Sequence, residues 1–79
     1  SSRSVGDVVD DSWITTKVKA DLAVTEGVPS TSISVTTVDG VVTLTGALPS
    51  ELAVKKAVAT ARAIKGVRQV DATALVVEG

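Results

Sequence analysis

The dipeptide Asp39-Gly40, set between two stretches that alternate apolar and hydroxyl side chains, restricts the fold most. Asp-Gly favours a type I′ turn, whose two central residues need positive φ, and this turn joins adjacent antiparallel strands. In residues 33–38 one set of side chains alternates with the other: Ile33, Val35 and Thr37 against Ser34, Thr36 and Val38. In residues 41–45 Val42 and Leu44 share a face. The segment 33–45 therefore predicts a β-hairpin with one face turned to a core.

An amphipathic helix is expected before the hairpin. Three consecutive residues suit its N-cap: Asp10, Asp11 and Ser12. The apolar residues Ile14, Val18 and Leu22 follow at a spacing of four, which makes one stripe on a helix. Gly27 and Pro29 predict that this helix ends by about residue 25.

A second helix and a last strand are expected after the hairpin. Ser50 is a suitable N-cap, and the helix it opens has one apolar face: Val54, Ala57, Val58, Ala61 and Ile64. A strand follows over residues 67–77, with two possible inward sets. The first is Val70, Ala72, Ala74 and Val76, and the second is Asp71, Thr73, Leu75 and Val77. The charge on Asp71 favours the first set.

The predicted order αββαβ defines an α+β fold. The hairpin gives an antiparallel pair, and a strand–helix–strand crossover adds the last strand in parallel. Both helices then cover one face of a three-stranded mixed sheet, which makes a two-layer sandwich. The chain has 79 residues, enough for one core, and we expect the domain to occupy 10–79, with 1–9 as a tether or linker.

Composition excludes much chemistry. The chain has no His and no Cys, which removes the commonest general base, the commonest metal ligand and any thiol nucleophile. The net charge of −1 and the single aromatic residue, Trp13, do not suit nucleic-acid binding. Helix capping accounts for the neighbouring carboxylates Asp10 and Asp11 without a metal ion. We therefore expect a module that is not an enzyme and uses neither cofactor nor metal.

The predicted elements and their glycines resemble the BON domain, the module named after bacterial osmotically induced periplasmic proteins and nodulation proteins. The resemblance covers residues 11–77 and has its clearest motif in the hairpin, Asp39-Gly40-Val41-Val42-Thr43-Leu44-Thr45-Gly46. A second motif is Gly66-Val67-x-x-Val70. Ala72 and Ala74 depart from the family, which often has Asn and then a large apolar residue at these positions.

The resemblance implies a function at the cell envelope. Members of the family occur in the periplasm, often with two or more copies of the domain, and are thought to attach to phospholipid membranes or to hold envelope structures together. Some are linked to osmotic stress. The resemblance thus implies weak attachment to anionic phospholipid, with no catalytic residue to carry over. The alternative is a protein-interaction module that pairs with another BON domain or envelope protein through its sheet, with Ser34, Thr36, Thr43 and Thr45 facing the partner.

Two groups of residues are candidates for lipid binding. On a helix, Lys55, Arg62 and Lys65 fall within an arc of roughly 80°, which predicts a basic strip for lipid headgroups or simply a solvated helix face. Trp13 shares its side of the first helix with Ala20 and Val24 and lies near Lys17. An amphipathic indole of this kind suits a membrane interface. Packing at the domain edge or on a neighbouring domain are the other possibilities for Trp13.

Overall fold

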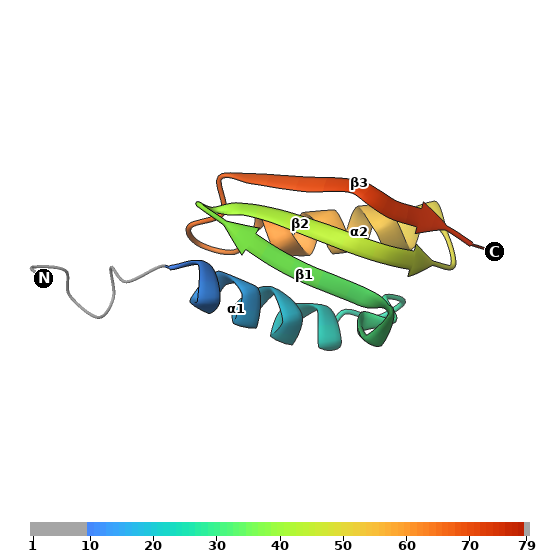
Figure 1. Ribbon diagram of the computed structural model, residues 1–79. Helices are drawn as coiled ribbons and strands as arrows, with labels where there is room; N and C mark the ends of the chain where they lie inside the picture. Colours follow the sequence, from blue (N-terminus) through green and yellow to red (C-terminus); the bar gives the residue numbers. More distant parts are fainter. Residues whose placement is uncertain (1–9, 79) are drawn as a thin grey trace, which may run out of the picture.

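The structure, a computed structural model, describes residues 10–78, so the expected tether over residues 1–9 lies outside the described residues. Its elements, in chain order, are α1 (Asp11–Ala23), the 3₁₀ turn η2 (Ser30–Ser32), β1 (Ile33–Val38), β2 (Val41–Leu48), α2 (Glu51–Arg62) and β3 (Gln69–Val77). The sheet has the order β1-β2-β3, with β1 antiparallel and β3 parallel to β2. Both helices lie on the same side of the sheet (Figure 1), which confirms the predicted α+β class and topology.

The hairpin turn forms as the sequence predicts. Asp39 and Gly40 have φ values of 50° and 81°, and Val38 pairs with Val41 on either side of them. The Asp11 carboxylate accepts hydrogen bonds from the backbone N–H groups of Asp39 and Gly40, at 2.9 and 3.1 Å. These bonds join the first turn of α1 to the tip of the hairpin.

The core lies between the sheet and the helices. Ile14, Val18 and Leu22 of α1 are buried, as their spacing predicts. Helix α2 contributes small side chains instead: Ala53, Ala57 and Ala61, with Ile64 beyond its end. Strand β2 is central, with β1 and β3 on either side of it, and its residues Val42 and Leu44 have no exposed surface. Thr37 is the one buried polar residue among the described residues, and it accepts a hydrogen bond from the Thr15 hydroxyl at 2.8 Å.

Strand β3 follows neither of the two predicted phases throughout. A β-bulge lies where Thr43 pairs with Asp71 but Thr45 pairs with Ala74, so β3 has an extra residue there. Because side chains alternate along a strand, the extra residue reverses the phase. Val70 and Ala72 pack against the core before the bulge, and after it the buried residue is Leu75. The prediction that Ala74 and Val76 face inward is therefore wrong.

The bulge is stabilised by the side chain of Asp71, which the sequence predicts to face outward. The Asp71 carboxylate accepts hydrogen bonds from the backbone N–H and the hydroxyl of Thr73, at 3.0 and 2.7 Å. Both bonds hold the pKa of Asp71 below its ordinary value, with the backbone bond contributing most. Local side-chain bonds of this kind compete with regular strand pairing.

Strand β2 continues past Gly46 to Leu48, which is buried. Gly46 therefore lies inside the strand, at a place where another part of the chain approaches closely. A Cβ atom at this position would clash with the carbonyl oxygen of Ser32, and the φ of 146° is one that other residues rarely adopt. Glycine allows η2 and β1 to lie directly against β2 here.

Candidate functional site

Trp13 lies in the first turn of α1 and outside the core. Its backbone N–H donates to the Asp10 carboxylate at 2.8 Å, which makes Asp10 the N-cap. Its side chain is 38% exposed, whereas the side chain of Ile14, the next residue, is 1% exposed. Ala20 and Val24, predicted to share the side of the helix with Trp13, are also exposed, Val24 to 83%. This side of α1 thus carries an indole and small apolar groups at the surface.

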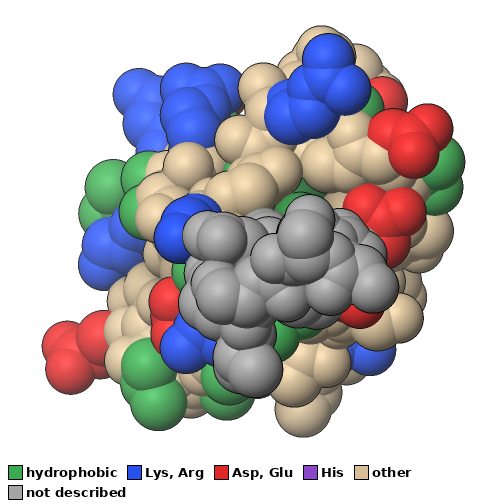
Figure 2. Space-filling view, turned by 90° about the vertical axis from the view of Figure 1, so that its left-hand side faces the viewer, with side chains coloured by type: hydrophobic (Ala, Val, Ile, Leu, Met, Phe, Trp, Pro, Cys, Tyr) green, Lys and Arg blue, Asp and Glu red, His purple; other side chains and the backbone are tan. Residues whose placement is uncertain are grey.

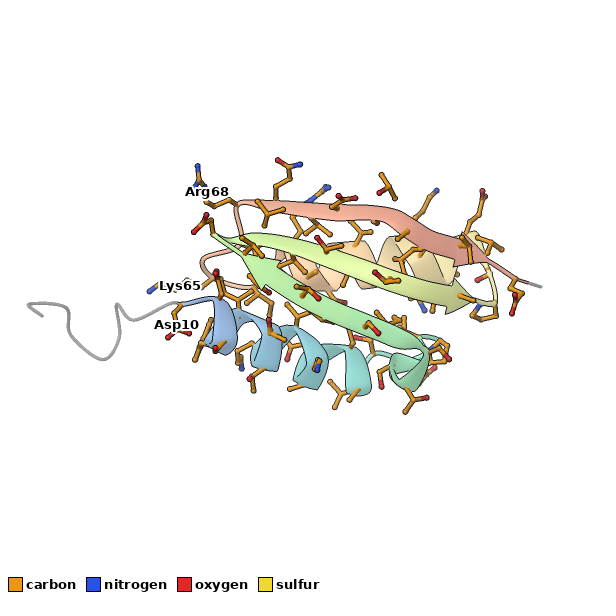
Figure 3. All side chains as sticks on the ribbon, viewed as in Figure 1. Asp10, Lys65 and Arg68 are labelled. Carbon is orange, nitrogen blue, oxygen red and sulfur yellow. The ribbon has the colours of Figure 1, made fainter. Side chains whose placement is uncertain are left out.

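The helices run in opposite directions, so the start of α1 and the end of α2 lie at the same end of the domain (Figure 1). Two contacts join the segment after α1 to the middle and last turn of α2: the hydroxyls of Thr25 and Thr60 lie 3.5 Å apart, and the Lys56 ammonium donates to the carbonyl of Glu26 at 3.2 Å. The antiparallel arrangement brings residues from opposite parts of the sequence to the hairpin end. Figure 3 shows Lys65 and Asp10, the N-cap of α1, both at this end of the domain.

Four of the five candidate residues lie on α1, at the end of α2 or in the turn after it. Trp13 belongs to the first turn of α1, Lys17 lies at the midpoint of α1, and Arg62 is the last residue of α2. Lys65 follows three positions later, in the turn that leads to β3. The side chains of Lys17, Arg62 and Lys65 are exposed. We call these four residues the end cluster.

The predicted basic strip on the second helix is only partly formed. Lys55 and Arg62 are both exposed on α2, but seven residues separate them, a rise of about 10 Å. Lys65 lies beyond the end of α2, so helical spacing does not align it with the other two. Lys55 borders a hollow that Leu75 and Val77 of β3 also line, which places Lys55 on the side of α2 that faces β3. Lys55 is therefore set apart from the end cluster.

One basic residue outside the predicted strip, Lys56, lies between the helices. Lys56 reaches the loop after α1, where it meets the carbonyl of Glu26 and lies 3.4 Å from the position of a Cβ on Gly27. The neighbouring apolar residues Val24 and Leu52 are 83% and 61% exposed. An i, i+4 or i, i+7 pattern on either helix alone does not reveal Lys56, because its position depends on how the two helices pack together.

Charge is unevenly distributed around the domain. Figure 2 looks at the hairpin end and shows most Lys and Arg side chains on the side where α2 lies behind the sheet. Asp and Glu side chains gather mainly on the opposite side, toward the open face of the sheet. In residues 10–78 no group of three or more acidic, His or Cys side chains is arranged to hold a metal ion. Within the same residues, neither helix has the length and apolar character required to cross a bilayer.

A two-layer αββαβ domain with these hairpin and turn glycines belongs to a known class. The sequence profile of the BON domain matches residues 10–79, and the chain is a member of the BON domain family. It is 44% identical over 71 residues to the osmotically-inducible protein Y of Escherichia coli strain K12. The match covers 90% of this chain and 35% of that protein. The chain thus spans about a third of the length of its curated relative.

Proposed function

We propose that this domain is a non-catalytic module that attaches weakly to anionic phospholipid, in a protein of the periplasm or cell envelope that acts during osmotic stress. The membership of the BON family and the relative named for osmotic induction support this setting. The observation that carries the lipid proposal is the end cluster, in which an exposed indole accompanies three exposed basic side chains.

The chemistry of the end cluster fits the headgroup region of a bilayer. An indole ring is most stable at the boundary between headgroups and acyl chains, where its ring is dehydrated and its N–H stays hydrated. Lys17, Arg62 and Lys65 would contribute about 1 kcal/mol each near an anionic surface. Lys55 would add a contact when the domain tilts toward the side of α2. A single small cluster gives weak binding, and repeated domains in one protein would raise the effective affinity.

The single tryptophan provides a direct test of this proposal. Intrinsic fluorescence of the protein comes from Trp13 alone, so insertion into the interface should shift its emission to shorter wavelength when phosphatidylglycerol vesicles are added. Trp13→Ala should weaken co-sedimentation with the same vesicles. Sedimentation of the wild-type protein with an unchanged emission spectrum would contradict a role for Trp13 at the interface.

The basic residues are tested by neutral substitutions. At about 1 kcal/mol for each charge, the triple variant K17Q/R62Q/K65Q should bind phosphatidylglycerol vesicles roughly 100-fold more weakly at low salt. Lys19→Gln is the matched control, because Lys19 is exposed on α1 but borders a hollow beside β1. K55Q measures how much Lys55, on the side of α2 that faces β3, contributes to vesicle binding. Equal binding to phosphatidylcholine and phosphatidylglycerol vesicles, insensitive to salt, would contradict the electrostatic mechanism.

The open face of the sheet favours a second candidate function, pairing with another BON domain or envelope protein. Its pairs include Thr36 with Thr43 and Ser34 with Thr45, as the sequence predicts for a partner surface. Val38 and Val76 lie on the same face and are 61% and 52% exposed. Sedimentation equilibrium with the wild type and with Thr43→Lys tests this proposal, which predicts association that the lysine abolishes.

A further inference from the structure

The outer edge of β1 presents backbone groups that no described residue pairs. In an antiparallel ladder closed by a two-residue turn, Val38, Thr36 and Ser34 bond to β2, and the residues between them point their N–H and C=O groups the other way. The outward groups belong to Ile33, Val35 and Thr37. The N–H of Ile33 donates to the carbonyl of Ser30, and within residues 10–78 no other hydrogen bond reaches these outward groups. Each of the three residues keeps 8% exposure, whereas Val42 and Leu44 of the central strand keep none.

A groove runs along this edge, between β1 and α1. It consists of two hollows of ≈ 240 and ≈ 390 Å³, and Val35 borders both of them. The walls are mainly hydroxyl side chains and short aliphatic ones. Helix α1 contributes Asp11, Ser12, Thr15, Thr16, Lys19 and Leu22 to them. The groove is long enough for an extended segment that follows β1 from one end to the other.

The two ends of the groove differ in charge. Lys19 borders the hollow near Ile33, and Asp11 borders the hollow near Thr37. The Asp11 carboxylate already accepts two backbone hydrogen bonds from the hairpin. Lys19 is thus the charged group that would attract a charged ligand, and a positive charge favours a carboxylate. The carboxylate would bind at the Ile33 end of the groove, where Lys19 lies.

The groove fits a peptide strand better than a second copy of the domain. Helix α1 lies alongside β1 and extends past its edge (Figure 1), so a strand that carries its own helix on the same side would collide with it. A free extended segment has no such helix. Strand β1 itself has no Pro, no charged residue and no bulge, the features with which proteins usually protect an exposed edge.

We propose that the edge of β1 is a binding site for an extended peptide that adds a fourth strand, antiparallel to β1, with its C-terminal carboxylate beside Lys19. Antiparallel pairing is the more stable arrangement, and it directs the C-terminus of the peptide toward the Ile33 end of the groove. Main-chain bonds to Val35, to Thr37 and to the carbonyl of Ile33 would supply affinity. Small or β-branched side chains would suit the hydroxyl walls. This site is independent of the proposed attachment to lipid.

The test uses a synthetic heptapeptide, acetyl-Thr-Val-Thr-Val-Thr-Val-Val with a free carboxylate, titrated into the full ¹⁵N-labelled chain. The proposal predicts saturable shifts along β1 and slowed hydrogen exchange at the amides of Val35 and Thr37. N-methylation of alternate residues that face β1 should abolish binding, because it removes the donors of the new ladder. Amidation of the C-terminus, or Lys19→Gln, should weaken binding about fivefold, as for an exposed ion pair.

Matched controls separate this site from the others. Lys55→Gln and Trp13→Ala should bind the peptide like the wild type, whatever their effect on vesicles. Shifts centred on β3 or on the outer surfaces of the helices, binding that survives N-methylation, or no saturation at millimolar peptide would each overturn the proposal. Protection of the Val35 amide from hydrogen exchange in the peptide-free protein would also overturn the proposal. Protection that rises with protein concentration would indicate that a second copy covers the edge. Protection that does not depend on concentration would indicate a segment of the same chain.

Discussion

The two halves of this domain pack by different means. In one half α1 meets β1 through large aliphatic side chains, Ile14, Val18 and Leu22. In the other half α2 meets β2 and β3 through Ala53, Ala57 and Ala61, which are 0 to 2% exposed. Large side chains hold a helix axis away from its neighbour, and alanine lets the backbones approach. The half with large side chains leaves a groove along a regular edge strand, and the half with alanine faces an edge strand that is bulged.

This difference separates the two kinds of surface that the domain offers. Strand β3 carries Asp71, a bulge and flanking charges at Arg68 and Glu78, which discourage strand addition. Strand β1 has none of these and borders the groove. Meanwhile both helices expose residues of the end cluster. The proposed lipid-binding residues and the proposed peptide-binding edge therefore use different side chains.

The largest effect is expected in the half that depends on aliphatic volume. Leu22→Ala removes a side chain that is 1% exposed and leaves a cavity under α1, so it should lower the free energy of unfolding by about 2–5 kcal/mol. Denaturation in urea measures this loss. Val24→Ala, at the C-cap of the same helix and 83% exposed, should change stability by less than about 0.5 kcal/mol. Similar losses for the two variants would contradict the assignment of the aliphatic stripe to the core.

The opposite substitution tests the half built from alanine. Ala57→Leu adds three carbon atoms where the side chain has no exposed surface, and we expect a loss of about 1–3 kcal/mol through overpacking against the sheet. Ala59→Leu is the matched control, because Ala59 is exposed two positions along the same helix. The control should unfold at the urea concentration of the wild type. A neutral or stabilising A57L would show that α2 does not approach the sheet closely.

A smaller effect is expected for the bonds that tie α1 to the hairpin. Asp11→Ala removes the acceptor for the N–H groups of Asp39 and Gly40 and should cost about 1 kcal/mol, because the site is partly exposed and water replaces the carboxylate. Hydrogen exchange at both amides should become faster. Asp11→Asn retains one acceptor oxygen and should lie between the wild type and Asp11→Ala. Unchanged exchange in Asp11→Ala would show that the turn is stable without the helix.

Local patterns in the sequence predicted most of this architecture. The N-caps Asp10 and Ser50, the stripe on α1 and the turn at Asp39-Gly40 each depend on residues only a few positions apart. The fold class followed from their order, because short connections leave few ways to pack two helices on three strands. In contrast, the extension of β2 to Leu48 is stabilised by pairing with β3, a contact between distant segments.

The candidate site was harder to predict for the same reason. Helical spacing grouped Lys65 with Lys55 and Arg62, but α2 ends at Arg62, so the turn determines where Lys65 lies. Spacing also could not show how the two helices lie relative to each other. Their antiparallel packing depends on contacts between distant parts of the chain, such as that of Lys56 with Glu26, thirty positions apart.

The smallest effect concerns the bulge that distinguishes β3 from β1. Hydrogen bonds from Thr73 lower the pKa of Asp71 in the folded protein relative to its ordinary value, so the unfolded chain binds this proton more readily. The stabilisation is therefore complete at neutral pH and is lost as the pH falls through the folded pKa. Asp71→Ala should shift the urea midpoint slightly at pH 7 and not at a pH below that value. Asp71→Asn keeps an acceptor for Thr73 without the charge, so it should preserve the bulge while removing this pH dependence. The same small shift in Asp71→Ala at both pH values would show that the carboxylate charge contributes nothing to the bulge.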